Sequence, residues 1–223
     1  MLPQPFIKTQ VLSRITTAPP SSVWTPPDFL DLGSRDAVDK ALQRLVSTND
    51  LRRIDRGLYD RPRINNLTGQ IAPPDYRKVI DAIGRRDQIR SLLDGITAAN
   101  DLGLSNAVPG QVIVRTDGRL RPIKLENLTI QFKLTSPSKL YWAGRPAMRV
   151  VQALYWLRDS LKQDASLDHT MIQPKLVRIL QDATQGSAIR NDLRTGLHTL
   201  PGWMQKWIRE LLNQADPTAT LQS

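Results

Sequence analysis

The sequence predicts an α+β protein in which an N-terminal winged helix-turn-helix precedes a mixed domain with a small antiparallel sheet and several helices. Two observations predict the first part. Between residues 23 and 60 the spacing of apolar residues changes from a helical to a strand period, and the strand part carries several arginines. A third observation predicts the rest, because residues 66–223 contain both extended runs and helical stretches.

Apolar spacing and proline define the first elements. Residues 7–15 place apolar side chains at helical intervals, and the proline pair that follows ends this helix. Residues 22–24 form a short strand that can pair with a later hairpin. Residues 26–32 begin with two prolines and an aspartate, which suit a first helical turn, and Gly33 permits a sharp turn into the next helix.

The second helix starts at Ser34, a residue type that caps helix N-termini. Its apolar stripe is predicted to be buried and consists of Ala37, Val38, Ala41, Leu42, Leu45 and Val46. Its opposite face is polar and consists of Arg35, Asp36, Asp39, Lys40, Gln43 and Arg44. Residues 51–54 then alternate with period two, Asp55-Arg56-Gly57 forms a turn, and Leu58-Tyr59 returns. In the predicted fold this hairpin is the wing.

Residues 61–74 contain three prolines and have no sustained period, so we interpret them as a linker. The domain boundary is expected near residue 65. This gives a winged helix-turn-helix domain over residues 1–65 and a second domain over residues 66–223, within which residues 164–223 form a helical extension of unknown role.

The second domain is expected to begin with a helix from Asp75 that ends at Gly84, followed by a short helix over residues 97–102. Three extended runs follow, over residues 111–116, 120–125 and 128–134. Because Asp117-Gly118 is a typical hairpin pair, these runs predict an antiparallel meander. The remaining helices are expected near residues 146–161, 171–183, 187–197 and 201–214.

Charge is the strongest global property of the chain. The formal net charge is +10. The excess of basic over acidic residues is 3 in residues 1–63 (10 against 7), 7 in residues 64–163 (15 against 8), and zero beyond (6 against 6). Such an excess favours polyanions through counterion release, with an affinity that depends on salt and not on base sequence.

Composition also excludes several kinds of site. The chain has no cysteine, so disulfides, thiolate zinc sites and thiol nucleophiles are absent. His169 and His198 have no partners at metal-ligand spacing, and no phosphate-loop or nucleophile-elbow motif occurs. We therefore expect no catalytic residues, no metal and no cofactor. No segment is long and apolar enough for a membrane span and the first residues do not match a signal peptide, so a cytoplasmic protein is expected.

Three strings carry a resemblance to a known family. They are RIDRGLYD at the end of the hairpin, GITAANDLGLSNAVPGQVIVRTDG, and IQFKLTSPSKLYWAGRPAMRVVQALYWLRD. Over roughly residues 5–160 the sequence resembles the AbiEi-like antitoxins, which are transcriptional regulators of type IV toxin–antitoxin (AbiE abortive infection) systems. The resemblance implies a winged domain that binds repeats in the promoter of its own operon. It also implies a second domain that neutralises a nucleotidyltransferase-like toxin without forming a stable complex with it.

Docking of a helix-turn-helix on double-stranded DNA places residues near the start of the second helix at base edges. Ser34, Arg35 and Asp36 are therefore the candidates for base contacts, with Lys40, Gln43 and Arg44 nearer the backbone. Asp36 and Asp39 accept from cytosine or hold a neighbouring basic side chain in place. In the hairpin the candidates are Arg52, Arg53 and Arg56, of which alternation lets at most two reach one strand of DNA. We favour Arg53 and Arg56.

Other functions compete with this interpretation. The chain can be a plain winged-helix regulator without antitoxin activity, whose second domain serves folding or oligomerisation. A nuclease is a weaker alternative, built on Asp94, Asp117, Glu126 and Lys133, but Gln131 stands where a second carboxylate ligand is needed. The tryptophans of the second domain are predicted to be core residues. On the resemblance alone, Arg115, Arg119 and Arg121 are assigned to the antitoxin surface, clustered around one hairpin.

Overall fold

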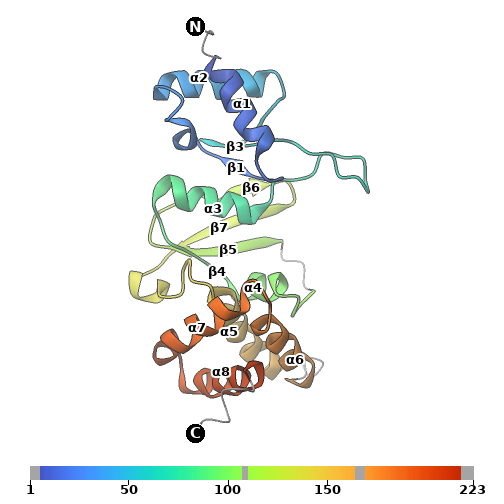
Figure 1. The fold of residues 1–223 in the computed structure, drawn as a ribbon, viewed down its shortest axis with the longest axis vertical. Coiled ribbons are helices and arrows are strands. Elements are labelled where there is room, and N and C mark those ends of the chain that lie inside the picture. Colours follow the sequence, from blue (N-terminus) through green and yellow to red (C-terminus); the bar gives the residue numbers. More distant parts are fainter. Residues whose placement is uncertain (1–5, 107–109, 164–168, 217–223) are drawn as a thin grey trace. The chain divides into compact units, whose positions relative to one another are not determined.

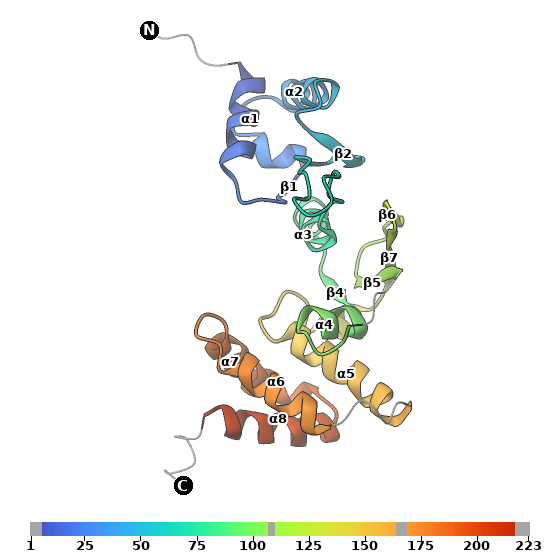
Figure 2. The same cartoon turned by 90° about the vertical axis from the view of Figure 1, so that its right-hand side faces the viewer.

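The computed structural model describes residues 6–106, 110–163 and 169–216. Over these residues the protein is a mixed α+β structure with eight α-helices and two small sheets (Figures 1 and 2). The chain divides into two compact units. Unit 1 comprises Met1–Ile89 and Arg121–Ile130, and unit 2 comprises Arg90–Leu120 and Gln131–Ser223.

Unit 1 begins with the elements that the apolar spacing predicts. They are α1 (Ile7–Thr17), β1 (Val23–Trp24), the 3-10 helix η1 (Pro26–Phe29), α2 (Arg35–Ser47), β2 (Arg52–Asp55) and β3 (Leu58–Asp60). The segment expected as a short α-helix after β1 is a single 3-10 turn, started by its two prolines. The strands form an antiparallel sheet in the order β1-β3-β2, so the predicted pairing of the first strand with the hairpin is confirmed.

The core of this part lies between α1, α2 and the sheet. Its buried side chains are Val11, Ile15, Phe29, Val38, Leu42, Leu45, Leu51 and Tyr59. The predicted stripe of α2 is confirmed at Val38, Ala41, Leu42 and Leu45, whereas Ala37 and Val46 at its margins are half-buried. Burying one such leucine contributes roughly 1.5–3 kcal/mol, which holds α2 against the sheet and leaves its polar face outside.

Residues 61–74 are an ordered hairpin, so the linker interpretation was wrong. Ile64 and Ile71 form an isolated bridge, and the Ala72 backbone N–H donates to the Arg63 carbonyl at 2.7 Å. The Arg52 guanidinium also donates to the Ala72 carbonyl at 3.1 Å, which attaches the returning part of this segment to strand β2. Local turn chemistry and a long-range side-chain bond together order a segment whose composition is typical of a loop.

Unit 1 also extends past the boundary expected near residue 65. Helix α3 (Tyr76–Asp87) contacts β1 and β3, and four of its apolar side chains are buried, namely Val79, Ile80, Ala82 and Ile83. The helix continues through Gly84 to Asp87, and its C-cap Gln88 is left-handed at φ +53°. Gly84 therefore does not end the helix as predicted.

The second sheet has the strands β4 (Ser91–Leu93), β5 (Gln111–Thr116), β6 (Ile123–Leu125) and β7 (Leu128–Leu134) in the order β4-β5-β7-β6. The predicted meander was wrong, because β5 lies beside β4 and β7, not beside β6. Asp117 does not close a hairpin: its carboxylate accepts from the backbone N–H and the Nε of Arg90, both at 2.9 Å. The tight turn lies instead at Glu126, at φ +52°, between β6 and β7.

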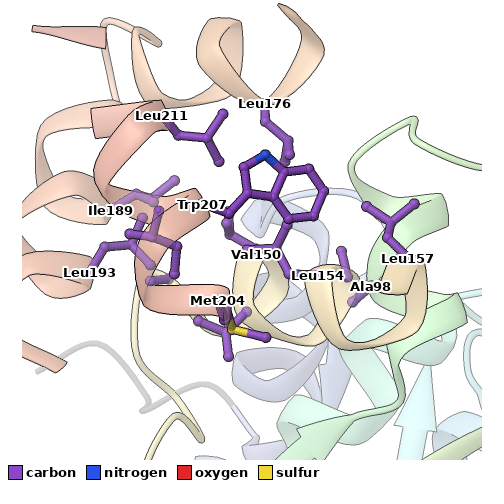
Figure 3. Packing of buried hydrophobic residues seen from close by; sticks show 14 of the residues in the cluster. Ala98, Val150, Leu154, Leu157, Leu176, Ile189, Leu193, Met204, Trp207 and Leu211 are labelled. Carbon is purple, nitrogen blue, oxygen red and sulfur yellow. The ribbon is translucent and has the colours of Figure 1, made fainter. Parts of the chain in front are cut away.

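The helices of unit 2 are α4 (Gly95–Asp101), α5 (Met148–Gln163), α6 (His169–Leu180), α7 (Gly186–Gly196) and α8 (Gly202–Ala215), with short 3-10 helices η2 (Pro137–Leu140) and η3 (Leu197–Thr199). All five α-helices were predicted within a few residues. Figure 3 shows how they share one core, in which Trp207 of α8 packs among Leu154 of α5, Leu176 of α6 and Leu211. Residues 169–215 therefore complete the core of unit 2 and are not an appendage.

Candidate nucleic-acid interface

The outer face of α2 presents the polar residues that the sequence placed there. The Ser34 hydroxyl accepts from the Ala37 backbone N–H at 3.4 Å, so the predicted N-cap is confirmed. The other candidates on this face are exposed, namely Arg35, Asp36, Lys40, Gln43 and Arg44. Asp39 accepts from the Nε of Arg35 at 2.9 Å, one helical turn away. Of the two roles considered for Asp39, the structure shows the one in which it positions an arginine.

The hairpin comes shortly after α2 in the chain. A hydrogen bond from the Leu51 backbone N–H to the Leu45 carbonyl, at 3.1 Å, attaches the start of the hairpin to the helix. Its two strands join through Gly57, whose φ of +67° is strained for any other residue type. Arg53 and Arg56 are exposed on this hairpin. Two cationic side chains are thus available to solvent on this hairpin.

Arg52 has a different role from its neighbour. Its guanidinium forms a two-pronged ion pair with Asp60 across the hairpin, with N···O distances of 2.9 and 2.6 Å. The Asp60 side chain is only 5% exposed, and this hydrogen bonding raises the pKa of Arg52. Removing one partner of a buried ion pair costs about 3–5 kcal/mol, so Arg52 stabilises the hairpin and we leave it out of the candidate DNA contacts.

Two arginines of α3 attach this helix to the hairpin and to β1. The Nη1 of Arg86 donates to the Arg56 carbonyl at the hairpin tip at 2.8 Å, and its other nitrogens bind Asp87. This ion pair with Asp87 raises the pKa of Arg86. Arg85 donates to the Val23 carbonyl of β1 at 3.2 Å. Basic residues in the last turn of a predicted helix are the one sequence signal for these contacts.

The three arginines expected on an antitoxin surface do not flank one hairpin. Arg115 lies on β5 and is exposed, and Arg119 is exposed in the segment that leaves it; both belong to unit 2. Arg121 belongs to unit 1. The expected cluster depended on a hairpin between β5 and β6, which the strand order rules out.

The acidic residues weighed for a nuclease are engaged in local contacts. Asp94 caps α4 by accepting from the Thr97 backbone N–H at 3.1 Å, and Asp117 binds Arg90. Glu126 lies 3.8 Å from Arg52 in unit 1. No group of three or more His, Asp or Glu side chains that could hold a metal ion occurs among the described residues.

Unit 2 contains a pocket of about 580 Å3 between β4, β5, α4 and α5. Its lining combines aromatic rings, two basic residues and three other polar side chains. The lining includes Asp94, Arg115, Lys139, Gln152, Tyr155 and Trp156. Of the four tryptophans predicted to be structural, Trp142 and Trp207 are buried in the core, while Trp156 and Trp203 pack against it. Trp142 and Trp156 also line the pocket.

Residues 10–185 match a family of unknown function, DUF6088. The chain belongs to that family. The DUF6088 match spans the winged-helix candidate, the second sheet and the helices of unit 2 up to the residue before α7. Helices α7 and α8 lie beyond it.

A comparison with solved structures finds similarity to the Rv2827c protein of Mycobacterium tuberculosis, at 18% identity and a TM-score of 0.42, over 95% of this chain and 78% of that one. No curated protein sequence matches. None of the helices in the described part of this DUF6088 chain has the length and apolar character needed to cross a bilayer.

Proposed function

We propose that this protein is a sequence-specific DNA-binding repressor, and that residues 6–60 form a winged helix-turn-helix. The observation that carries the proposal is the order of elements: helix, strand, short helix, a second helix with an exposed polar face, and an arginine-bearing hairpin. In this arrangement α2 is the recognition helix that enters the major groove, and the hairpin contacts the backbone or the minor groove.

The side chains divide by the kind of contact that they can make. Arg35 reads guanine bidentately from the start of α2, and its ion pair with Asp39 reduces the rotamers that it must lose on binding. Arg44 lies farther along the helix and suits a phosphate contact. Arg53 and Arg56 bind phosphates, with the tip of their hairpin held by Arg86. Ordered cations of this kind give both affinity and register.

The proposed target is the promoter of the gene's own operon, where repeated half-sites suit a helix-turn-helix protein. The test is a mobility-shift titration of the DNA upstream of the gene against a random duplex of equal length, at two salt concentrations. Selective retardation at about 150 mM salt is expected. Equal retardation of both duplexes that vanishes with salt would reduce the protein to a non-specific polyanion binder.

Two variants show which surface binds. Arg53→Ala/Arg56→Ala removes two exposed charges from the hairpin, and Arg119→Ala/Arg178→Ala removes two exposed arginines from unit 2 as the matched control. The hairpin variant is expected to lose at least tenfold in affinity while the control keeps it. Equal losses would assign binding to net charge alone.

We further propose that the protein is the antitoxin of a type IV system, acting on a nucleotidyltransferase-like toxin through unit 2 without a stable complex. The resemblance over residues 5–160 supports this proposal. Cells that express the toxin encoded beside this gene are expected to survive with the Arg53→Ala/Arg56→Ala variant, because neutralisation does not need DNA. Failure of the wild-type protein to protect would leave the plain repressor, the competing function.

A further inference from the structure

We propose that the pocket of unit 2 is a binding site for a nucleoside phosphate. The proposal concerns a small molecule and is independent of DNA binding. It rests on three properties of the lining that occur together: two cations without acidic partners among the described residues, aromatic rings, and polar groups suited to the edge of a base.

The cations are Arg115 of β5 and Lys139 of η2, which are both exposed and both belong to the lining of the pocket. Most other arginines of unit 2 are paired, as Arg90 is with Asp117 and Arg145 with Asp192. In the described part of the chain, neither Arg115 nor Lys139 has an ion pair or a side-chain hydrogen bond. A guanidinium and an ammonium group in the lining of one pocket match a phosphate group in charge and in hydrogen-bond donors.

Aromatic side chains of α5 form the wall. Trp156 is half-buried, and Tyr155, which is 39% exposed, meets Trp203 edge to face at a ring distance of 6.2 Å. Burial raises the pKa of Tyr155, so its hydroxyl remains a neutral donor. An aromatic face of this kind stacks on a nucleobase, with about 1–3 kcal/mol per base in known cases.

Two further polar side chains of the lining suit the edge of a base. The Oδ1 atom of Asp94 accepts the hydrogen bond that caps α4. Its Oδ2 atom has no hydrogen bond in the described part of the chain. Gln152 adds an amide from α5. A carboxylate oxygen beside an amide can accept from and donate to the edge of a base, which an inorganic anion does not require.

The pocket is built on closely packed elements. A Cβ added at Gly95 would lie 2.5 Å from the Cβ of Trp156 and 2.7 Å from the Gln152 carbonyl, so α4 and α5 approach each other as closely as a glycine allows. The aromatic and polar residues of α5 are therefore fixed against α4 before any ligand arrives. The volume of about 580 Å3 lies within the range of roughly 300–1,000 Å3 that is typical of small-molecule sites.

Tryptophan fluorescence and calorimetric titration of the full chain without DNA test the proposal. The probes are ATP, GTP, CTP, UTP and their monophosphates, with pyrophosphate and a single-stranded 12-mer as comparisons. Saturable binding of at least one nucleotide below millimolar concentration is expected. No saturation by any nucleotide, equally tight binding of pyrophosphate, or tighter binding of the 12-mer would each overturn it.

Variants place the binding in the pocket. Arg115→Ala/Lys139→Ala is expected to weaken nucleotide binding at least tenfold, and Tyr155→Leu, which keeps an apolar side chain, several-fold. The control Arg119→Ala/Lys206→Ala removes the same charges from exposed positions outside the pocket lining. If Arg115→Ala/Lys139→Ala binds nucleotide with unchanged affinity and melts at the wild-type temperature, the site is refuted. Tyr155→Leu tests the aromatic part of the lining even if the charge variant is unstable.

Discussion

Arg52 and Arg53 are neighbours in β2, yet they have opposite environments. Successive side chains of a strand point to opposite faces, so one arginine turns to Asp60 and the other to solvent. The pair shows why an arginine-rich hairpin cannot be taken as a set of equivalent DNA contacts. Residue-scale roles in this protein are decided by the partner that each cation meets.

Arg35 and Arg53 are predicted to differ in the kind of loss that their removal causes. Arg35→Ala should lower the preference for the cognate operator by about 1–3 kcal/mol, because it removes a base contact. Arg53→Ala should weaken binding to every duplex and lower the salt slope by about one, because it removes a phosphate contact. Titrations on cognate and random DNA over a salt series measure both. Equal losses for Arg35→Ala on the two duplexes would remove it from base reading.

The ion pair between Arg90 and Asp117 makes a pH-dependent contribution to stability. Its hydrogen bonds lower the pKa of Asp117 below the ordinary value of 3.8. The contribution is therefore complete above pH 3.8 and is lost as the pH falls through the lowered native value. Urea unfolding at pH 6 should show Asp117→Asn less stable than wild type, and the difference should narrow below pH 3.8. A gap that stays constant to pH 2.5 would contradict this, and Glu210→Gln is the charge-matched control.

At the scale of elements, α3 determines how firmly the hairpin is held. Arg86→Ala removes the bond to the Arg56 carbonyl without touching a proposed DNA contact. Amide exchange in residues 52–60 is expected to accelerate and DNA affinity to fall several-fold, because the loosened tip must be ordered on binding. Lys78→Ala, an exposed change on the same helix, is the control. Unaltered exchange in the hairpin would show that the sheet alone holds it.

The junction of α4 and α5 depends on a missing side chain. Gly95→Ala places a Cβ 2.5 Å from Trp156, so the two helices must separate, at an expected cost of about 1–3 kcal/mol. Gly202→Ala at the start of α8 meets nothing within 4 Å and should be neutral or slightly stabilising. Thermal and urea unfolding of the two variants measure the difference. Similar stabilities would mean that α5 adjusts without cost.

At the scale of the whole molecule, the path of the chain matters. It leaves unit 1 after Ile89 and returns for Arg121–Ile130 before it enters unit 2 again. A cut near residue 65 therefore removes α3, whose apolar face is buried in unit 1. A fragment of residues 1–65 is expected to melt well below a fragment of residues 1–89, as followed by circular dichroism. Equal midpoints would restore the boundary near residue 65.

The sequence by itself determined the positions of most helices and strands, the hairpin after α2 and the polar face of α2. These features follow from local periodicity, capping and turn chemistry, which act over a few residues. Only the tertiary structure decided the strand order β4-β5-β7-β6, the extent of unit 1, the pairing of Arg52 with Asp60 and the lining of the pocket. Each of these depends on which distant segments meet when apolar faces are buried and charges find partners, and no local pattern in the chain specifies that.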